Sequence, residues 1–287
     1  MNLVASQSYI DAAFAMAFPS ALPEEGRYLI VLDGYFDESG THDDSETITV
    51  DGYLAHVNSW RPFETKWKEA LAEYKLDFFH MSEFAHRRSG YDWPEDMRRE
   101  RLGHLIEIIN EFTWHSFGVG IPKKLFESVF TGRARRFIDG PYGFASWLIV
   151  NLVSRELDRL DLETGVAYVF EDGAPGKGEL LTMYEGLPTF SGGKEALHVL
   201  SLRLEDKRRF VPLQAADILA YELYLDRPKQ NNPELRRTPL QLLDTGIWHL
   251  MTEPNLRAYA AVIDMLAAGD IGPDMSPDIW KSLGPDR

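Results

Sequence analysis

The sequence predicts an α/β protein, because segments typical of strands and of helices alternate between residues 28 and 226. The run 28–36 is rich in β-branched and aromatic residues, which favour strands. Turn-forming residues at 39–45 separate it from a second strand-like run at 48–55. Apolar residues at 60–74 then recur with the spacing of a helix. These observations predict a strand hairpin followed by a helix at the start of the fold.

The remaining elements follow from the same kinds of pattern. Asn58 or Ser59 is the expected N-cap of the helix at 60–74. The loop at 173–178 lacks the Ser or Thr of a phosphate-binding P-loop, so we expect it to lead into a helix near Leu180. Further helices are predicted at residues 94–109, 143–160, 212–226, 240–251 and 256–268, and further strands at residues 113–121, 165–170 and 197–204.

A polar spacer at 228–233 predicts a boundary near the end of the chain. We therefore expect an N-terminal segment (1–27), a main domain (28–226) and a C-terminal helical appendage (227–287). The chain has 287 residues and no cysteine, which excludes disulfides and thiolate zinc sites. No apolar run reaches the ~20 residues that span a bilayer. Residues 12–18 lack the preceding positive charge of a signal peptide. We expect a cytoplasmic protein that does not bind a membrane.

The net charge of −15 excludes a generic nucleic-acid coat protein, because such proteins are basic. An acidic excess is compatible with a metal-dependent nuclease whose basic residues gather locally. Such clusters occur, and each of them is also compatible with a solvated helix face or loop. They are Arg87-Arg88, Arg98-Arg99 with Arg101, Arg133 with Arg135-Arg136, Lys207-Arg208-Arg209, and Arg236-Arg237.

Two acidic pairs each end a predicted strand: Asp37 with Glu38, and Glu171 with Asp172. A carboxylate held at a strand end loses hydration free energy unless a partner neutralises it. A divalent metal ion is one such partner, so Asp37 and Glu38 are candidate catalytic residues. In the second pair, either Glu171 or Asp172 could be the metal ligand. Ser39, with the glycine after it, is expected to shape the turn.

Two further acids lie three residues from a polar neighbour, so that each pair shares one helix face. Gln214 and Asp217 interrupt an otherwise apolar helix, where Gln214 would orient Asp217 toward a metal. The alternative is a buried aspartate that Gln214 or an arginine hydrogen-bonds. His80 and Glu83 form the second pair, with Glu83 as a metal ligand and His80 as a supporting donor. The alternative is a helix start capped by Ser82.

The combination of these acids predicts a site for Mg²⁺ or Mn²⁺. Both ions prefer oxygen ligands. Hydrolysis of a phosphodiester with two metal ions needs about four carboxylates that converge on ions ~4 Å apart. Asp37, Glu83, Asp217 and one of the pair Glu171 and Asp172 come from different elements and could supply this set.

Residues 37–40 (Asp-Glu-Ser-Gly) and 214–217 (Gln-Ala-Ala-Asp) resemble motifs of the bacterial and phage family called domain of unknown function 3800. That family is placed among ribonuclease H-like folds, and residues 80–83 resemble its middle acidic segment. The resemblance covers roughly residues 28–226. It implies a central mixed sheet that is opened by an antiparallel hairpin and flanked by helices, with acids at the centre of the sheet.

The resemblance also implies a Mg²⁺-dependent nuclease activity and a role in defence against mobile DNA. It implies that Asp37, Glu171 and Asp217 are the metal ligands of the first strand, the later strand and the late helix. We therefore expect a nucleic-acid substrate. A second copy of the chain or an operon-encoded protein is the expected protein partner.

The residues leave open three functions other than that of a metal-dependent nuclease. A catalytically silent interaction module would agree with the acidic balance and with the aromatic residues Trp248, Tyr259 and Trp280 of the appendage. A phosphohydrolase acting on nucleotides would use the same acids on small phosphate esters. Two carboxylates could also hydrolyse a glycoside, at a separation that the sequence does not give.

Overall fold

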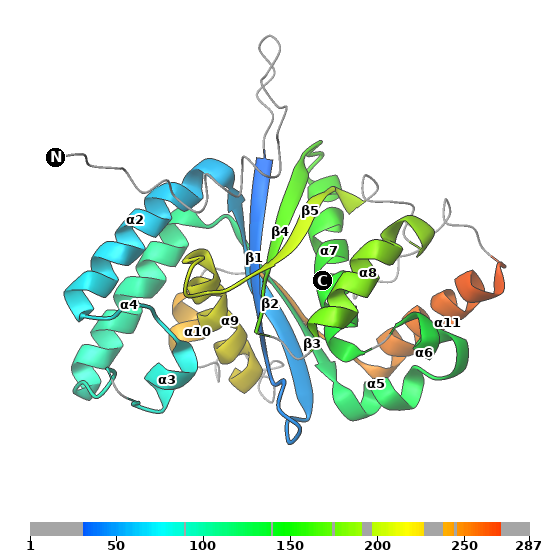
Figure 1. Cartoon of the computed structure of the whole chain (residues 1–287), viewed down its shortest axis with the longest axis horizontal. Helices are drawn as coiled ribbons and strands as arrows, with labels where there is room; N and C mark the ends of the chain where they lie inside the picture. The colour runs from blue at the N-terminus through cyan, green and yellow to red at the C-terminus, as the bar shows by residue number, and fades with distance from the viewer. Residues whose placement is uncertain are drawn as a thin grey trace, which may run out of the picture.

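The computed structural model describes residues 31–88, 90–138, 140–173, 176–190, 197–226, 238–243 and 246–270. The predicted N-terminal segment, the polar spacer at 228–233, Arg236-Arg237 and Trp280 lie outside these residues. A six-stranded sheet with the order β5-β4-β1-β2-β3-β6 forms the centre of the molecule (Figure 1). The strands are β1 (Val31–Ser39), β2 (Thr47–His56), β3 (His115–Pro122), β4 (Gly165–Glu171), β5 (Val199–Glu205) and β6 (Ile247–Leu250).

The sheet is mixed. β1 pairs antiparallel with β2, and β2 pairs antiparallel with β3. On the other side of β1, β4 and β5 run parallel to it, and β6 runs parallel to β3 at the far edge. Because β1 and β4 are parallel neighbours, their carboxyl ends meet at one edge of the sheet. The predicted α/β fold, with a mixed sheet opened by an antiparallel hairpin, is confirmed.

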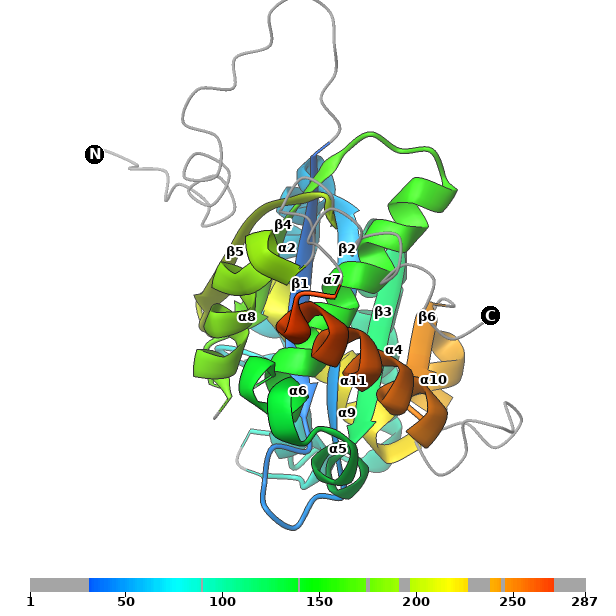
Figure 2. The ribbon, with the colours of Figure 1, turned by 90° about the vertical axis from the view of Figure 1, so that its right-hand side faces the viewer.

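Helices cover both faces of this sheet (Figure 1). One face carries α2 (Val57–Tyr74), α3 (Met81–Ala85), α4 (Glu95–Phe112), α9 (Pro212–Asp226) and α10 (Thr238–Leu242). The other carries α5 (Lys123–Val129), α6 (Gly132–Phe137), α7 (Pro141–Arg159), α8 (Lys177–Phe190) and α11 (Glu253–Ala268). Figure 2 shows α11 lying across α6 and α5, against which it packs.

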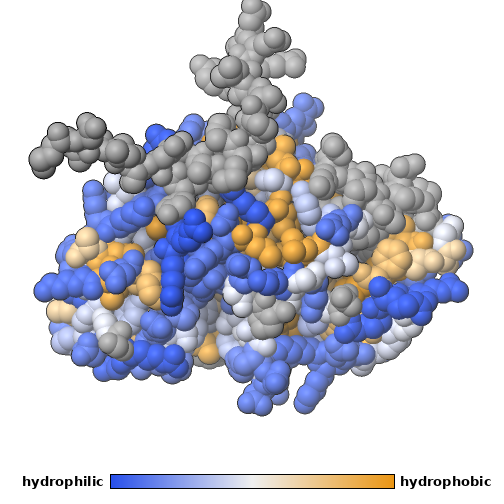
Figure 3. Space-filling view, viewed as in Figure 1, coloured by the Kyte–Doolittle hydropathy of each residue, from blue (hydrophilic) through white to orange (hydrophobic). Residues whose placement is uncertain are grey.

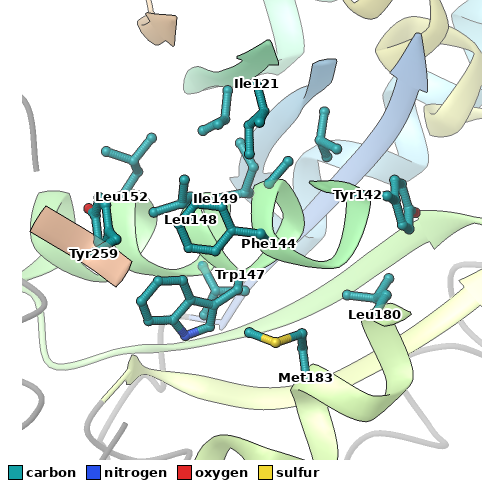
Figure 4. Packing of buried hydrophobic residues seen from close by; sticks show 14 of the residues in the cluster. Ile121, Tyr142, Phe144, Trp147, Leu148, Ile149, Leu152, Leu180, Met183 and Tyr259 are labelled. Carbon is teal, nitrogen blue, oxygen red and sulfur yellow. The ribbon is translucent and has the colours of Figure 1, made fainter. Parts of the chain in front are cut away.

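Each face has its own apolar core, because successive side chains of a strand point to opposite faces. In β1, Tyr35 packs with the core under α2 and α9, whereas its neighbour Phe36 packs with the core under α7. Figure 4 shows the second core around α7, with Phe144 and Trp147 in contact with Tyr259 of α11. Burial of such large aromatic side chains supplies much of the free energy that holds the helices on the sheet.

The hairpin of β1 and β2 differs from the prediction at two places. Asp37 and Glu38 lie at the end of β1 as predicted, but Ser39, expected in the turn, is the last residue of the strand, and Gly40 begins the turn with a φ of +78°. A side chain at Gly40 would meet the carbonyl oxygen of Thr47, so the position needs glycine. The predicted N-cap of α2 is wrong: His56 caps the helix through Nδ1, which accepts from a backbone N–H.

The chain after α9 contains a strand where the sequence predicted a helix. The prediction of a helix through residues 240–251 is wrong, because Ile247–Leu250 is β6 and pairs with β3. The indole of Trp248 donates to the hydroxyl of Ser116, which anchors the strand at this edge. The helix predicted at 256–268 is confirmed as α11, and its Tyr259 lies in the α7 core. Trp248 and Tyr259 therefore have partners within the chain.

The surface of the described residues is mostly hydrophilic on the face in Figure 3, with separated apolar areas. No helix of the described residues has the length and apolar character needed to cross a bilayer. Large exposed apolar side chains occur singly on several elements, as is normal for a folded domain. They are Met97, Trp114, Leu181, Leu200, Leu242 and Met265.

Candidate active site

Two acids lie side by side where β1 and β4 end. Asp37 follows Tyr35 by two residues, and Glu171 follows Val169 by two, so all four side chains point to the α9 face. Tyr35 and Val169 are direct partners in the parallel pairing, which brings Asp37 and Glu171 to the same level of the sheet. Asp37 is 2% exposed and Glu171 is 7% exposed. The carboxyl ends of parallel strands are the usual location of ligand sites in α/β sheets.

The third acid comes from α9, which packs across β1 and β2. Asp217 is buried, and its Oδ2 accepts a hydrogen bond of 2.6 Å from the backbone N–H of Met81. Gln214, one turn earlier, is also buried but does not orient Asp217. Its Oε1 accepts from the indole of Trp67 and from the N–H of Phe79. The segment before α3 is thereby fixed to α9 at two backbone positions.

Lys207 lies between these acids. Its Nζ is 2.6 Å from Asp37 Oδ2 and 3.2 Å from Asp217 Oδ1. Its backbone N–H donates to Glu171 Oε2 at 2.8 Å, and its carbonyl oxygen accepts from Gln214 Nε2 at 2.9 Å. The lysine side chain is 16% exposed. A single residue after β5 therefore contacts all three acids and the glutamine that the sequence analysis selected.

Glu38 approaches the same place from the other face of β1. Its N–H donates to Asp37 Oδ1, and its own Oε2 is buried without a hydrogen-bond partner among the described residues. Tyr142, at the start of α7, is also buried, and Figure 4 shows it with the residues of the α7 core. Burial raises the pKa of Tyr142, and the negative charges of Glu38 and Asp37 raise it further. We call Asp37, Glu38, Glu171 and Asp217 the carboxylate cluster.

Burial dominates the electrostatics of the cluster. It raises the pKa of Asp37, although the Lys207 ammonium opposes this. Burial and the charge of Asp37 raise the pKa of Glu38 well above its ordinary value. Burial and Asp37 also raise the pKa of Glu171 to about 8. Burial disfavours the charged form of Lys207, but Asp37 and Asp217 outweigh it, so the pKa of the ammonium is raised. Without a further cation, burial and mutual repulsion therefore favour the protonated, neutral form of Glu38 and Glu171.

Four residues selected from the sequence lie outside these contacts. Asp172 is 48% exposed at its side chain and pairs with Lys177 instead. Glu83 and His80 are each 32% exposed at their side chains and face one another at 3.7 Å. The alternative role for Ser82 is not borne out, because α3 has His80 at its N-cap position and no side-chain cap. Ser39 is half-buried in β1.

Sequence reasoning missed Lys207 and Tyr142. Lys207 was recognised only as part of a basic cluster, and a solvated surface was one explanation for it. The signal that could have found it is its position: it follows the end of β5, as Glu171 ends β4. Parallel strands bring their carboxyl ends to one edge, so a cation there meets the acids. Tyr142 carries no comparable signal, because only the packing of α7 places it near Glu38.

The carboxylate oxygens of the cluster are of the chemical type that binds a divalent ion. Carboxylate oxygens are the ligands that Mg²⁺ and Mn²⁺ prefer, and Glu38 Oε2 is buried without a partner among the described residues. Their spacing is not that of a closed metal cage: no group of three or more His, Asp or Glu side chains in the described part of the chain is arranged to hold an ion. The Lys207 ammonium instead lies between Asp37 and Asp217.

A cavity of about 620 Å³ lies behind the cluster, between α3, α4, α9 and α10. Its lining includes Met81, whose backbone N–H holds Asp217, together with Arg98 and Tyr221. Arg98 donates to the backbone carbonyls of Phe84 and Tyr91. This arginine therefore holds the α3 segment in place, and the cavity contains none of the clustered carboxylates.

Comparisons with known proteins do not identify a family. No protein-family model and no curated protein matches the chain. Among solved structures, the chain is similar to a chain of the PCNA:RNase HII complex from Archaeoglobus fulgidus, with a TM-score of 0.36 and 14% sequence identity. The similarity covers 85% of this chain and 92% of that chain. A structural similarity with so low a TM-score assigns no activity to the chain. Membership in the family called domain of unknown function 3800 stays a prediction.

Proposed function

We propose that the chain is a nuclease that hydrolyses phosphodiester bonds with the help of Mg²⁺ or Mn²⁺. The observation that carries the proposal is the convergence of Asp37, Glu171 and Asp217 on one position beside Lys207. These acids come from β1, β4 and α9, and burying them together lowers stability unless cations neutralise them. Glu38 adds a fourth carboxylate from the opposite face of β1.

In this proposal, Asp37, Glu38, Glu171 and Asp217 would hold the metal. A bound divalent ion would supply positive charge to a phosphate and activate water as the nucleophile. The N–H groups of Met81 and Lys207 keep the carboxylates of Asp217 and Glu171 in position. Lys207 places positive charge beside the acids, where a phosphate backbone would need it. A role in defence against mobile DNA belongs to the same proposal and rests on the sequence resemblance.

The test is cleavage of labelled single-stranded RNA, duplex RNA, single- and double-stranded DNA and an RNA–DNA hybrid, with Mg²⁺ or Mn²⁺ and with a chelator. We expect metal-dependent cleavage of at least one substrate. Asp37→Asn and Asp217→Asn should each lower the rate by at least about 100-fold, because each removes a ligand charge. Asp172→Asn is the matched control, since it changes an acid outside the cluster. Cleavage that survives Asp37→Asn would contradict the proposal.

The rival proposal is a silent module that binds a protein or nucleic acid. One observation favours it: Lys207 already forms ion pairs with Asp37 and Asp217, as in a structural network. A silent module would show no metal-dependent turnover of any substrate, including the small ester bis(p-nitrophenyl) phosphate. Turnover of that ester without cleavage of nucleic acids would instead favour a nucleotide phosphohydrolase.

A further inference from the structure

The cavity between α3, α4, α9 and α10 has the size and the lining of a small-molecule site (Figure 1). Its volume of about 620 Å³ lies within the range of ~300–1,000 Å³ that is usual for such sites. Apolar side chains form much of its wall, so an apolar body bound there would be removed from water. They include Met81, Phe84, Leu102, Ile106 and Leu225.

Arg98 brings a partly satisfied guanidinium to the wall of this cavity. Nη1 donates to the carbonyl oxygens of Phe84 and Tyr91, and the buried guanidinium stacks on the Phe84 ring at 4.1 Å. Nε and Nη2 have no hydrogen-bond acceptor among the described residues. Glu95 Oε2 is 3.6 Å from Nε, beyond hydrogen-bond distance, and accepts from Arg87 at 2.7 Å instead. The Nε and Nη2 edge is a fork that fits both oxygens of a carboxylate or phosphate.

The charges that line the cavity leave an attraction for an anion. Arg99, exposed on α4, forms no ion pair or hydrogen bond within the described part of the chain. Glu95 is shared by Arg87 and Arg98. Glu222, the other acid of the lining, is fully buried in α9 and has a partner of its own. The charge that still needs a partner is therefore positive.

We propose that this cavity binds a small organic anion, with its carboxylate or phosphate on Arg98 and Arg99 and its apolar body on the apolar wall. The inference goes beyond the proposed function and holds whether or not the chain is a nuclease. A fatty acid and a nucleotide share this chemistry, because each joins an acidic group to an apolar or aromatic body. The guanidinium fork would select these anions over neutral molecules of the same shape.

Occupation of the cavity would also reach the carboxylate cluster. Met81 lines the cavity, and its N–H donates to Asp217 at 2.6 Å. Tyr221, another lining residue, lies one turn after Asp217 on α9. A ligand that packs on Met81 should therefore steady the backbone group that holds Asp217 and slow the hydrogen exchange of that amide.

The test is isothermal titration calorimetry with octanoate and with adenosine monophosphate, each compared with its neutral analogue, 1-octanol or adenosine. We expect at least one of the two anions to bind at a single site, and its neutral analogue to bind at least about 10-fold more weakly. Binding of octanoate alone would identify a fatty-acid site, and binding of adenosine monophosphate alone would identify a nucleotide site. No binding of either anion at millimolar concentration, or equal binding of an anion and its neutral analogue, would overturn the inference.

Gly103→Trp tests whether the anion binds in this cavity. Gly103 lines the cavity from α4, and a Cβ added there would meet no other atom, so the variant should fold and abolish binding by filling the cavity. Gly178→Trp, at a glycine of α8 with equally open surroundings, is the matched control and should bind as the wild type does. Unchanged binding by a folded Gly103→Trp would overturn the inference.

Hydrogen exchange of the wild type decides the location even if Gly103→Trp does not fold. The bound anion should slow exchange in residues 81–85 and 98–106, which line the cavity, and leave residues 177–186 of α8 unchanged. Slower exchange in other parts of the chain, with no change in residues 81–85 and 98–106, would overturn the inference.

Discussion

The side-chain amide of Gln214 donates to the carbonyl oxygen of Lys207 at 2.9 Å, while its Oε1 accepts from Trp67 and from the N–H of Phe79. One buried side chain thus joins α9 to α2, to the segment before α3 and to the loop after β5. The glutamine holds the lysine backbone rather than Asp217. Its position explains how three distant segments of the chain meet at the cluster.

Gln214→Ala is expected to lower the free energy of unfolding by about 3 kcal/mol, because it leaves a buried indole N–H, a buried backbone N–H and a carbonyl without partners. Denaturant unfolding of both proteins measures the difference. Gln241→Ala, at an exposed position of α10, is the control and should change stability by no more than about 0.5 kcal/mol. An equally small effect of Gln214→Ala would show that the three bonds are not important for stability.

Glu171 is buried whereas its neighbour Asp172 is exposed, so substitutions of the two residues should have different effects on the cleavage rate. Glu171→Gln removes an ionisable carboxyl, the proposed metal ligand of β4, from the cluster and is expected to lower cleavage at least about 100-fold. Asp172→Asn changes an exposed side chain paired with Lys177 and should leave the rate within about threefold. Initial rates at saturating Mn²⁺ give both values. The reverse order of effects would move the active acid to Asp172.

Lys207→Met is expected to destabilise the metal-free protein by about 3 kcal/mol, because buried Asp37 and Asp217 lose their cation. Mn²⁺ should raise the melting temperature of this variant more than that of the wild type, since bound ions replace the missing charge. Thermal unfolding with a chelator and with Mn²⁺ measures both effects. Lys177→Met should behave as the wild type does under both conditions.

Asp33 provides a pH-dependent test away from the cluster. It is 4% exposed on β1, and burial raises its pKa to about 6 from 3.8, although Arg203 opposes the shift. Between about pH 4 and pH 6 the folded protein keeps a proton that the unfolded chain has lost, so this group makes stability fall as the pH rises. Asp33→Asn removes that contribution. Above pH 6 it should be the more stable protein, by up to about 3 kcal/mol.

The measurement for Asp33 is chemical unfolding at a series of pH values. The difference between Asp33→Asn and the wild type should grow through the window from about pH 4 to pH 6 and then stay constant. Asp43→Asn, in the exposed hairpin turn, is the control and should track the wild type throughout. A constant difference between Asp33→Asn and the wild type at every pH would mean that the Asp33 carboxyl does not change its protonation on folding.

Local patterns in the sequence predicted most of the secondary structure. The apolar run before Asp37 lies in β1, which continues to Ser39, and the helix predicted at residues 212–226 is α9, with both of its bounds as expected. The helix predicted across residue 248 failed, because the partner of β6 is β3, more than a hundred residues earlier. Local periodicity carries no information about such a partner.

The sequence by itself determined that Asp37 and the pair Glu171-Asp172 stand at strand ends and that Asp217 lies on an apolar helix, because residue type and periodicity put them there. The tertiary structure decided the rest. Parallel pairing of β1 and β4 set Asp37 beside Glu171, and the packing of α9 brought Asp217 to them. It also decided that the cation among them is Lys207. Lys207 is the cation because its charge lies close to these acids, and the distances between separate elements are set only when the chain folds.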